Sequence, residues 1–457
     1  MSGFFAIKQG LDLSLEGKPS GEIVDVSKTD RIILHPSEFT RAKPRLEVAP
    51  GDKVKKGTVL YYDKRNPAFK YRSPVSGTIK DIVLGARRSL QEIHIDVSGR
   101  AVEKLPSFNA DALLSADRTE LLNQLSGTGL LSLLTERPFS RPATVNTTPK
   151  SIFVNGMANA PFRPDPNIVL QGREVEFAAG LAALKRLTLG PVHLCLDADE
   201  TATNSALTAA KGVEISYFSG PHPSGNTSTH IHHLDPIFPG DVVWAINACD
   251  LVQIGELLTT GQVPSTKVIM AAGPGLSPEA RRYYKVAIGQ PISSFLGEAF
   301  VPDTEARIVD GDVFCGTPVT VDSGVRTHTR GLTVLSEDRE RHLLGWMMPG
   351  YDKFSTFRTY MSSWFGAGRD WNMGTSRNGS HRSMVLTGIY DKYVPLDIMV
   401  DSLSRACIGH DTDDAIRHGI LGTDPEDFAL CSVVCPSKTD FCEIIRKGLA
   451  EIEAEGL

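Results

Sequence analysis

The sequence lacks any uninterrupted apolar run of about 18 residues, the length that a membrane-spanning helix requires. The nearest candidate, residues 242–258, contains Asp250 and Glu256. Residues 1–15 contain no signal-peptide core, so we expect the chain to remain in the compartment where it is made. A block of lysines and arginines is also missing and the net charge is −6, which argues against nucleic acid as a partner.

Cysteine is scarce, and the one pattern that would bind metal is incomplete. The seven cysteines are an odd number without regular spacing, which predicts free thiols in a reducing cytoplasm. Cys431-Ser-Val-Val-Cys435-Pro436 matches the second half of the bacterial ferredoxin motif, whose first two cysteines would stand at positions 425 and 428. Pro425 and Phe428 occupy those positions, and neither side chain can bind iron. We therefore predict a degenerate iron–sulfur motif and no metal bound by this chain.

Packing is the alternative role for Cys431 and Cys435. Only Cys407 and Cys442 could complete a cluster, and both lie outside the required spacing. We interpret Cys431 and Cys435 as two buried thiols at the start of a helix, with Pro436 at its first position. An apolar run with helical spacing follows, made of Phe441, Ile444, Ile445, Leu449 and Ile452.

Nucleotide-binding loops are missing as well. Gly127-Thr-Gly129 has no third glycine and no preceding strand, so it predicts the end of one helix and the start of another. Residues 155–169 follow a predicted strand but contain neither G-x-G-x-x-G nor a Walker lysine. The sequence therefore assigns neither NAD nor a nucleoside triphosphate to the chain.

The clearest positive pattern is an alternation of strands and helices. Apolar strand patterns at 152–154, 192–196 and 213–218 are separated by helical patterns at 173–187 and 202–211. This order predicts a Rossmann-like α/β domain with a parallel sheet and right-handed crossovers. Ligands of such sheets bind at loops that leave the carboxyl ends of the strands, here residues 155–169, 197–200 and 219–229.

Four histidines, His222, His230, His232 and His233, follow the third strand. Two or three imidazoles could bind zinc, but no cysteine or carboxylate has the spacing that would complete a tetrahedral site. We interpret the four as hydrogen-bonding histidines of a loop.

Residues 46–82 consist of short β runs broken by Gly-Asp and Pro-x-x-Gly turns, which is typical of a small all-β unit. The turns Val48-Ala-Pro-Gly51-Asp52 and Ser73-Pro74-Val75-Ser-Gly77 resemble those of the biotinyl/lipoyl barrel-sandwich fold. A swinging-arm carrier would need a lysine at the hairpin apex, where this chain has Arg65-Asn66-Pro67-Ala68. We therefore interpret this module as a packing or docking unit.

The aromatic residues concentrate between Leu344 and Phe365, with helical spacing at 357, 360, 361, 364 and 365. We expect a helix buried on the domain core, and an exposed docking face for a membrane partner is the alternative. Before this segment, residues 263–321 are β-rich and resemble the soluble-ligand-binding β-grasp module. From Asp391 onward we expect helices.

The predicted fold class is a multidomain α/β protein. Its parts are a barrel-sandwich hybrid (lipoyl-like) domain at 1–100, a Rossmann-like parallel α/β domain at 101–258, a β-grasp (SLBB-like) domain at 259–330 and a mostly helical domain at 331–457 that carries the degenerate ferredoxin motif.

Several segments in series carry a family resemblance. They include Lys8-Gln-Gly10-Leu-Asp-Leu13, Arg137-Pro-Phe-Ser140, Thr148-Pro-Lys-Ser-Ile-Phe153, Gly172-Arg-Glu174, Thr229-His-Ile-His232, Leu344-Gly-Trp346 and Phe428-Ala-Leu-Cys431. In this order, and nearly end to end, the chain resembles the A subunit of the Na+-translocating NADH:quinone oxidoreductase. That family is related to the C subunit of Rnf complexes and to the flavin subunit of respiratory complex I.

The resemblance implies a peripheral subunit on the cytoplasmic face of the bacterial inner membrane, in a complex that oxidises NADH, reduces ubiquinone to ubiquinol and exports Na+. It implies that NADH, FAD, FMN and iron–sulfur centres lie on partner subunits. It also implies a translocase subunit, inactive alone, that assists quinone reduction with ubiquinone as substrate. The alternatives are a cofactor-free scaffold that seats the membrane subunits and a free-standing flavin-dependent NADH dehydrogenase.

Two segments, residues 34–39 and 139–141, are candidate contacts with quinone or with the membrane partner, and ordinary turn structure is the alternative for both. Together with the aromatic segment they supply six candidate residues: His35, Phe39, Phe139, Arg141, Trp346 and Phe354. No catalytic residue can be assigned.

Overall fold

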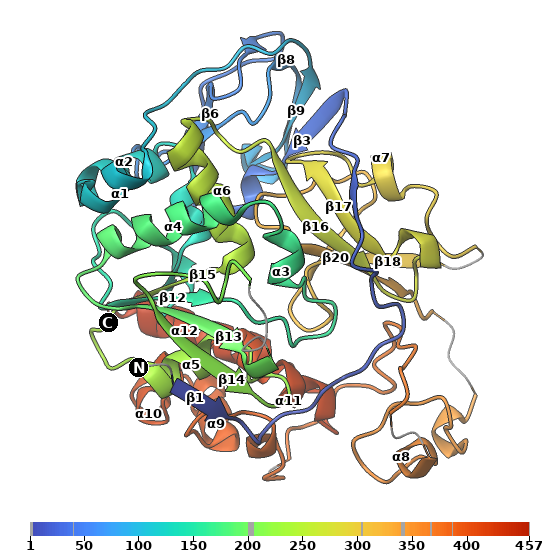
Figure 1. Cartoon of the computed structure of the whole chain (residues 1–457). Helices are drawn as coiled ribbons and strands as arrows, with labels where there is room; N and C mark the ends of the chain where they lie inside the picture. The colour runs from blue at the N-terminus through green and yellow to red at the C-terminus, as the bar shows by residue number, and fades with distance from the viewer. Residues whose placement is uncertain are drawn as a thin grey trace.

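The computed structural model describes residues 3–39, 41–199, 205–302, 305–339, 343–365, 368–385 and 387–456. Its central element is a seven-stranded sheet in the order β1-β14-β13-β12-β15-β10-β11 (Figure 1). The strands are β1 (Gly3–Ala6), β10 (Thr135–Arg137), β11 (Arg141–Pro142), β12 (Ser151–Asn155), β13 (Val192–Asp197), β14 (Glu214–Ser219) and β15 (Val243–Asn247). The first five in the sheet order pair in parallel, and β10 and β11 add an antiparallel edge. The predicted parallel sheet is therefore confirmed.

Both faces of this sheet are covered by helices. Ile152 and Val154 of β12 pack in one apolar core with α4 (Glu174–Leu187) and α6 (Ala248–Thr260). Phe153, between them, packs in a second core with α9 (Val400–Ile408), α11 (Ala429–Val434) and α12 (Phe441–Ala454). Because successive strand residues point to opposite faces, a sheet buried on both sides requires apolar residues at consecutive positions. Figure 1 shows the resulting three layers.

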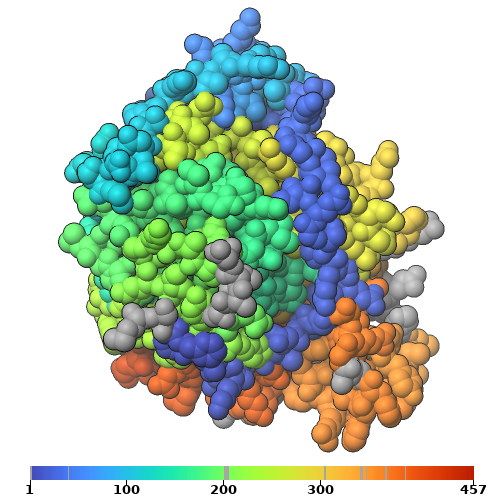
Figure 2. Space-filling model, viewed as in Figure 1, coloured from blue at the N-terminus to red at the C-terminus, as the bar shows by residue number. Residues whose placement is uncertain are grey.

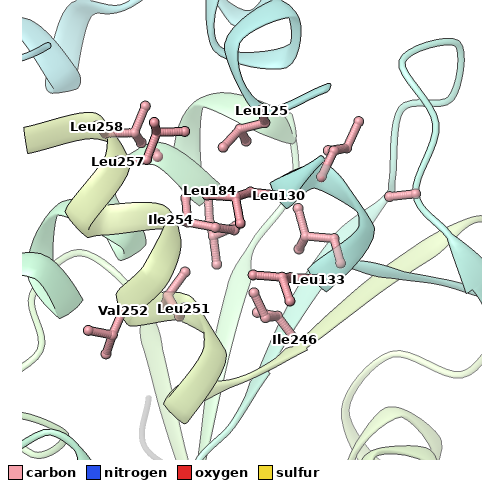
Figure 3. Close-up of a cluster of buried hydrophobic side chains, with 14 of the residues drawn as sticks. Leu125, Leu130, Leu133, Leu184, Ile246, Leu251, Val252, Ile254, Leu257 and Leu258 are labelled. Atoms are coloured by element: carbon pink, nitrogen blue, oxygen red, sulfur yellow. The ribbon is translucent and has the colours of Figure 1, made fainter. Parts of the chain in front are cut away.

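The helices α4 and α6 lie unusually close to each other. Gly180 of α4 and Gly255 of α6 face the partner helix, and a Cβ on Gly255 would stand 1.7 Å from the carbonyl oxygen of Glu176. Leu184 of α4 and Ile254 of α6 then lie side by side in the core (Figure 3). Glycine is required here because any side chain would push the two helix backbones apart.

A six-stranded mixed sheet, in the order β19-β18-β20-β16-β17-β2, lies beside the central sheet. Its strands are β2 (Ile23–Asp25), β16 (Thr266–Ala272), β17 (Arg282–Ala287), β18 (Ala306–Asp310), β19 (Thr317–Val319) and β20 (Gly331–Ser336). The β-rich character predicted for 263–321 is confirmed, whereas its identification as a β-grasp module stays a prediction. The strands β1 and β2 come from the chain's start but join these two sheets.

The N-terminal module consists of two small antiparallel sheets, β3-β9-β8-β5 and β4-β6-β7. Their strands are β3 (Arg31–Leu34), β4 (Pro44–Leu46), β5 (Lys53–Val54), β6 (Val59–Asp63), β7 (Lys70–Arg72), β8 (Gly77–Leu84) and β9 (Leu90–Val97). The β6–β7 hairpin carries residues 65–68 at its turn, as the sequence predicts. This module lies at the top of Figure 1.

Shorter helices complete the fold. They are α1 (Ala110–Ser115), α2 (Arg118–Ser126), α3 (Pro166–Val169), α5 (Thr227–Leu234), α7 (Ser293–Leu296), α8 (Ser362–Phe365), α10 (Thr412–Arg417) and, among 3-10 helices, η1 (Pro36–Glu38), η3 (Leu130–Leu133), η6 (Gly345–Met347), η8 (Ile420–Gly422) and η9 (Pro425–Phe428). Gly127 ends α2 and Gly129 precedes η3, so the predicted helix stop and restart are confirmed. The helices expected from Asp391 onward are confirmed too. Within the described ranges, no helix combines the length and the apolar character that crossing a bilayer demands.

The prediction of a helix at 202–211 is wrong for the residues of this segment that the structure describes. Residues 202–204 lie outside the described residues, and residues 206–209 form a turn. Thr208 Oγ1 accepts a hydrogen bond from the Ser205 N–H and donates one to the Ser205 carbonyl. Such local bonds compete with the helical pattern, which explains the turn.

The buried helix predicted over 357–365 is also wrong. Only Ser362–Phe365 is helical, and Phe357, Trp364 and Phe365 are exposed. The Arg358 guanidinium lies over the Trp364 ring at 5.1 Å and the Lys353 ammonium over the Tyr360 ring at 5.6 Å. The two rings make cation–π contacts at the surface of the protein. The helical spacing of the aromatic residues therefore does not mark a helix face that packs on the core.

Candidate functional site

A cavity of about 270 Å³ lies where three parts of the chain meet. These parts are the loop after β12, the end of β18 with the loop that follows, and η9, and the lining is completed by Glu38 and by residues between 326 and 331. The residues that bring charge or a titratable ring to it are Glu38, Arg163, Asp310, Asp312, Arg326, His328, Arg330 and Glu426. The loop after β12 is one of the three predicted ligand loops, and it leaves the carboxyl end of a parallel strand.

Arg163 is the residue that joins the three parts. One guanidinium nitrogen lies 3.1 Å from Asp312 Oδ2 and 3.2 Å from Glu426 Oε2. Asp312 Oδ1 also accepts hydrogen bonds from the backbone N–H groups of Phe314 and Cys315. The Arg163 side chain is 14% exposed and the Asp312 side chain 9%, so this ion triad is largely removed from water.

The two carboxylates of the triad differ in their proton affinity. Burial alone would raise the pKa of Asp312, but Arg163 and the two backbone N–H groups lower it below its usual value. Burial raises the pKa of Glu426, and the Arg163 charge offsets this only in part. Asp312 is therefore the lasting counter-ion of Arg163, and Glu426 is the carboxyl that takes up a proton first on acidification.

Glu38 and His328 form the opposite side of the cavity. Thr327 donates its backbone N–H to Glu38 Oε2 at 2.8 Å and its hydroxyl to Oε1 at 3.2 Å. Burial nevertheless raises the pKa of Glu38 to about 7, and it lowers the pKa of His328 to about 4. This side of the cavity therefore changes charge near neutral pH at Glu38.

The raised pKa of Glu38 predicts a pH-dependent stability. A carboxyl whose folded pKa lies above its unfolded pKa binds its proton more tightly in the folded state, so its stabilising contribution is complete below the unfolded pKa and is lost as the pH rises through about 7. Glu38→Gln should therefore be more stable than the parent at pH 8, by about 1–3 kcal/mol, with a smaller difference at pH 5. Urea denaturation of both proteins at the two pH values measures this.

The exposed carboxylate Glu16 offers a matched control for that experiment. Glu16→Gln should leave the difference between pH 5 and pH 8 unchanged, because an exposed carboxyl gains little from folding. A Glu38→Gln protein that followed the parent at both pH values would contradict the assignment.

A second cavity of about 280 Å³ adjoins the first and shares Phe162 and Arg163 with it. The N-terminal segment 12–15, with Lys18 and Pro19, covers it from outside, and residues 158–161 close it from within. Asp12 Oδ1 accepts the backbone N–H of His222 and thereby fixes the covering segment against the loop before α5. The two cavities therefore flank the 156–165 loop.

The four predicted loop histidines do not form a site. His230, His232 and His233 lie in α5, so their placement in a loop is wrong, and His222 precedes that helix. His230 and His222 are buried, whereas His233 is exposed. The His230 ring lies tilted against Phe218 at 4.4 Å, and the His222 ring stacks on Phe314 at 4.8 Å. Among the described residues, no group of three or more histidine, cysteine or acidic side chains is arranged to hold a metal ion.

Cys431 and Cys435 are both buried, as the packing interpretation predicts. Their placement at a helix start is wrong: Cys431 lies within α11, Cys435 caps its end, and Pro436 lies in the turn that follows. The next helix, α12, begins five residues later because the Asp440 carboxylate accepts the Glu443 N–H and caps it there. The Tyr390 hydroxyl lies 3.1 Å from Cys435 Sγ, and Phe428 is fully buried where a cluster would need a thiolate. This donor set does not fit a four-iron cluster.

The six candidate contact residues lie in different places. His35 is buried and its Nε2 accepts the Gly324 N–H, while Phe39 packs on Tyr71 at 4.2 Å. Arg141 pairs with Glu136 and Glu453, and it lies 5.9 Å from the Phe139 ring. Phe354 packs edge-on against Trp371 at 5.7 Å, and the side chain of Trp346 lies outside the described part of the chain.

Glu453 of α12 connects two of these places. It accepts hydrogen bonds from Arg141 at 2.9 Å and from Arg41 at 2.5 Å, and Arg41 lies two residues beyond the candidate segment 34–39. The assignment of any of the six residues to quinone stays a prediction.

Sequence reasoning identified the loop of the cavity but missed the residues that make its chemistry. Arg163 lies within residues 155–169, yet nothing in the sequence indicates that Asp312 and Glu426 approach it. The available signal was weak: an arginine flanked by prolines after a strand, in Pro161-Phe-Arg163-Pro-Asp165.

Two segments of this chain match known protein-family domains. Residues 5–98 match the NqrA N-terminal barrel-sandwich hybrid domain, and residues 116–263 match the NqrA second alpha/beta domain. The predicted barrel-sandwich fold of the N-terminal module is thereby confirmed. The boundaries drawn at 100, 258 and 330 stay predictions.

Curated relatives match along the whole chain. The A subunit of the Na(+)-translocating NADH-quinone reductase of Saccharophagus degradans is 38% identical over 452 residues, which cover 98% of this chain and 99% of the relative. The same subunit of Vibrio atlanticus is 36% identical over 452 residues, which again cover 98% of this chain and 99% of the relative. That of Histophilus somni strain 2336 is 37% identical over 451 residues. Among solved structures, an air-oxidized NAD+-reducing [NiFe]-hydrogenase covers 50% of this chain and 49% of its own at 14% identity, with a TM-score of only 0.36.

Proposed function

Because this chain belongs to the family formed by the A subunits of Na+-translocating NADH-quinone reductases, we propose that it is a peripheral subunit of such a complex. The proposed complex oxidises NADH, reduces ubiquinone to ubiquinol and exports Na+, and this chain lies on the cytoplasmic face of the bacterial inner membrane. NADH, FAD, FMN and iron–sulfur centres belong to partner subunits in this proposal. The resemblance to the family found in the sequence is confirmed by these relatives.

The observation that carries the proposal is a surface that we call the apolar lobe, residues 343–365. Its exposed side chains are Leu343 (90% exposed), Leu344 (54%), Met347 (65%), Met348 (53%), Tyr351 (56%), Phe357 (44%), Trp364 (64%) and Phe365 (75%). The lobe stands at the edge of the molecule, in orange in Figure 2. A contiguous group of exposed tryptophan, phenylalanine and methionine side chains is typical of the centre of a protein interface.

The lobe is joined to the rest of the molecule through Phe354, whose ring packs edge-on against Trp371 beside a buried apolar cluster. The backbone N–H of Trp371 donates to the Ser14 carbonyl, and the Ser362 hydroxyl donates to the Lys353 carbonyl. Residues 343–382 contain five lysines and arginines against two aspartates, in a chain whose net charge is −6. A fixed, basic and aromatic surface fits the cytoplasmic side of a membrane partner, where anionic headgroups lie nearby.

Co-purification tests this proposal. The tagged full-length chain, expressed in a host that lacks its own copy and extracted from membranes in mild detergent, should bring with it the other subunits of the complex. Recovery of the chain alone from the soluble fraction, with NADH–quinone reductase activity intact in the membranes, would overturn it.

We propose further that the chain assists the quinone-reduction step. Residues 34–39 and 139–141 are the segments for which quinone contact is proposed. Titrating the isolated chain with a short-chain ubiquinone, with tryptophan fluorescence as the signal, should give a saturable change. Each of His35→Ala and Arg141→Ala should weaken it by about 10-fold if these segments make the contact.

A cofactor-free scaffold is the second candidate function, and the charged lining of the first cavity favours it. A quinone needs a mostly apolar slot with one or two donors to its carbonyl oxygens, in a pocket of about 300–1,000 Å³. The first cavity is instead lined largely by arginines and carboxylates. The second cavity is mostly apolar, with Leu13, Leu15, Phe162 and Met270 beside Asp12, Lys18 and Arg163. The absence of any saturable fluorescence change, in a chain that still assembles with its partners, would establish the scaffold and exclude the quinone site.

A further inference from the structure

The first cavity lies where the connections of the seven-stranded sheet change direction. β12 lies between β13 and β15 (Figure 1), and Asn155 and Asn247, the last residues of β12 and β15, are paired. The chain leaves β12 toward β13 through α4, whereas it reaches β15 from β14 through α5, which packs on the opposite face of the sheet. Arg163, from the loop after β12, and Asn247 both line the cavity. Ligands of open α/β sheets bind at this position, outside the carboxyl ends of the two strands.

Two of the three arginines that line this cavity are weakly paired. Arg163 belongs to the ion triad described above. In contrast, a guanidinium nitrogen of Arg326 lies 3.9 Å from Asp310 Oδ2, and Arg330 Nε lies 3.5 Å from Asp250 Oδ2. A charge-assisted bond between a guanidinium and a carboxylate is usually about 2.7–2.9 Å long. Both guanidinium groups can therefore bind a further acceptor.

Arg326 carries the clearest sign of a missing acceptor. Its Nε is buried and has no hydrogen-bond partner within the part of the chain that the structure describes. A buried N–H donor that bonds to nothing costs free energy, because it has lost its hydrogen bonds to water. Since the Arg326 side chain also lines the first cavity, a ligand there can supply acceptor oxygens to its guanidinium group.

The size and charge of the cavity indicate the class of ligand. A volume of about 270 Å³ lies below the range of about 300–1,000 Å³ that is typical of pockets for drug-sized ligands, so the ligand is small. The planar guanidinium group matches a carboxylate in shape and binds it through two parallel hydrogen bonds. A phosphate group would concentrate its charge at one point among the four carboxyl groups of the lining. A molecule with two carboxylates instead places one charge beside each weakly paired arginine.

Solvent can reach the cavity from one side. Cys315 and Thr317, in the loop after β18 and at the start of β19, line the cavity and are exposed. The Arg330 side chain is 42% exposed. A small molecule can therefore enter beside β19 without separating the two large sheets.

From these observations we propose that the first cavity binds a small organic dicarboxylate, with one carboxylate on Arg326 and the other on Arg330. The residues concerned are separate from the segments 34–39 and 139–141, for which quinone contact is proposed. The proposal is independent of the function proposed above, since it requires neither a quinone nor a partner subunit.

Isothermal titration calorimetry of the full-length chain tests the proposal. The probes are malonate, succinate and glutarate, whose carboxylates are separated by progressively longer methylene chains, in a buffer free of carboxylate and phosphate at pH 7. At least one of them should bind saturably at one site per chain, with a Kd below about 1 mM. Inorganic phosphate should bind at least about 10-fold more weakly than the best diacid, and uncharged dimethyl succinate should give no saturable signal.

Three variants locate the site. Arg326→Gln keeps a polar side chain but removes the charge and the guanidinium fork, so it should weaken binding of the best diacid by about 10-fold or more. Thr317→Glu adds a negative charge at the exposed mouth of the cavity and should weaken binding several-fold without changing a buried group. Arg446→Gln is the matched control, because the Arg446 side chain is 61% exposed on α12 and should not affect binding.

Three outcomes would overturn the proposal. They are the lack of saturable binding for all three diacids up to about 10 mM, phosphate binding as tight as that of the best diacid, and unchanged binding in both Arg326→Gln and Thr317→Glu. The first two are measured on the parent chain, and Thr317→Glu alters an exposed position. The result therefore does not depend on whether Arg326→Gln folds.

Discussion

Replacing Arg163 with methionine is expected to lower the free energy of unfolding by about 3–5 kcal/mol. Methionine preserves most of the apolar length of the side chain but removes the charge that faces Asp312 and Glu426. Both carboxylates would remain largely buried without a cation, and an uncompensated buried charge costs far more than the pair itself contributes. Urea denaturation at pH 8, followed by circular dichroism, measures the loss.

The pH dependence of the same variant separates charge from packing. Burial already raises the pKa of Glu426, so acidification neutralises this carboxyl first and the destabilisation should shrink by pH 5. The double variant Arg163→Met with Glu426→Gln should recover part of the lost stability, because one uncompensated charge is then removed. A loss that is equal at pH 5 and pH 8, and that Glu426→Gln does not relieve, would show that packing and not charge is responsible.

An exposed ion pair supplies the matched control. Arg446 pairs with Glu443 on the outer face of α12, and its side chain is 61% exposed. Arg446→Met removes the same chemical groups from a solvated site, so the change should be at most about 1 kcal/mol. The comparison shows what the same substitution costs at a solvated ion pair.

The seven-stranded sheet and its helices were predictable because their signals are local. The strand at 151–155 has three consecutive apolar residues at its centre, 152–154, and the helix at 174–187 presents Phe177, Leu181 and Leu184 on one face. Both patterns follow from the period of the element and its burial on one or both sides. Where polar side chains bond their own backbone, as at Ser205 and Thr208, the same apolar spacing predicted a helix that does not form.

The candidate site was predictable only in part, for a physical reason. A parallel sheet places its loops at one edge, so the loop containing Arg163 could be named in advance. Its partners Asp312 and Glu426 come from the loop after β18 and from η9, and charge pairing between remote segments has no period in the sequence.

The aromatic segment shows how a correct pattern can be assigned to the wrong environment. Positions 357, 360, 361, 364 and 365 have helical spacing, which predicts burial on a core. Periodicity identifies one apolar face, but it does not say whether that face meets the chain's own core or another protein. Exposure of Trp364 and Phe365 favours the docking alternative over the buried helix.

The apolar lobe therefore gives the second large prediction. The double variant Trp364→Glu with Phe365→Glu should reduce the affinity of the chain for the rest of its complex by about 100-fold, because two desolvated aromatic anchors would be replaced by charges. The free chain should keep its unfolding temperature, since both side chains are mostly exposed, at 64% and 75%. Reconstitution of membranes stripped of the chain, followed by titration of bound protein and of NADH–quinone reductase activity, measures the affinity.

Phe238→Glu is the control for a charge placed on an exposed ring elsewhere, because Phe238 is 64% exposed and lies outside the lobe. It should bind like the parent. Equal binding by the lobe variant, or an equal loss in Phe238→Glu, would show that the lobe is not the docking surface. If the lobe variant binds weakly but restores full activity at saturation, the lobe serves assembly alone; if activity stays low at saturation, the seating of the chain also governs electron transfer to quinone.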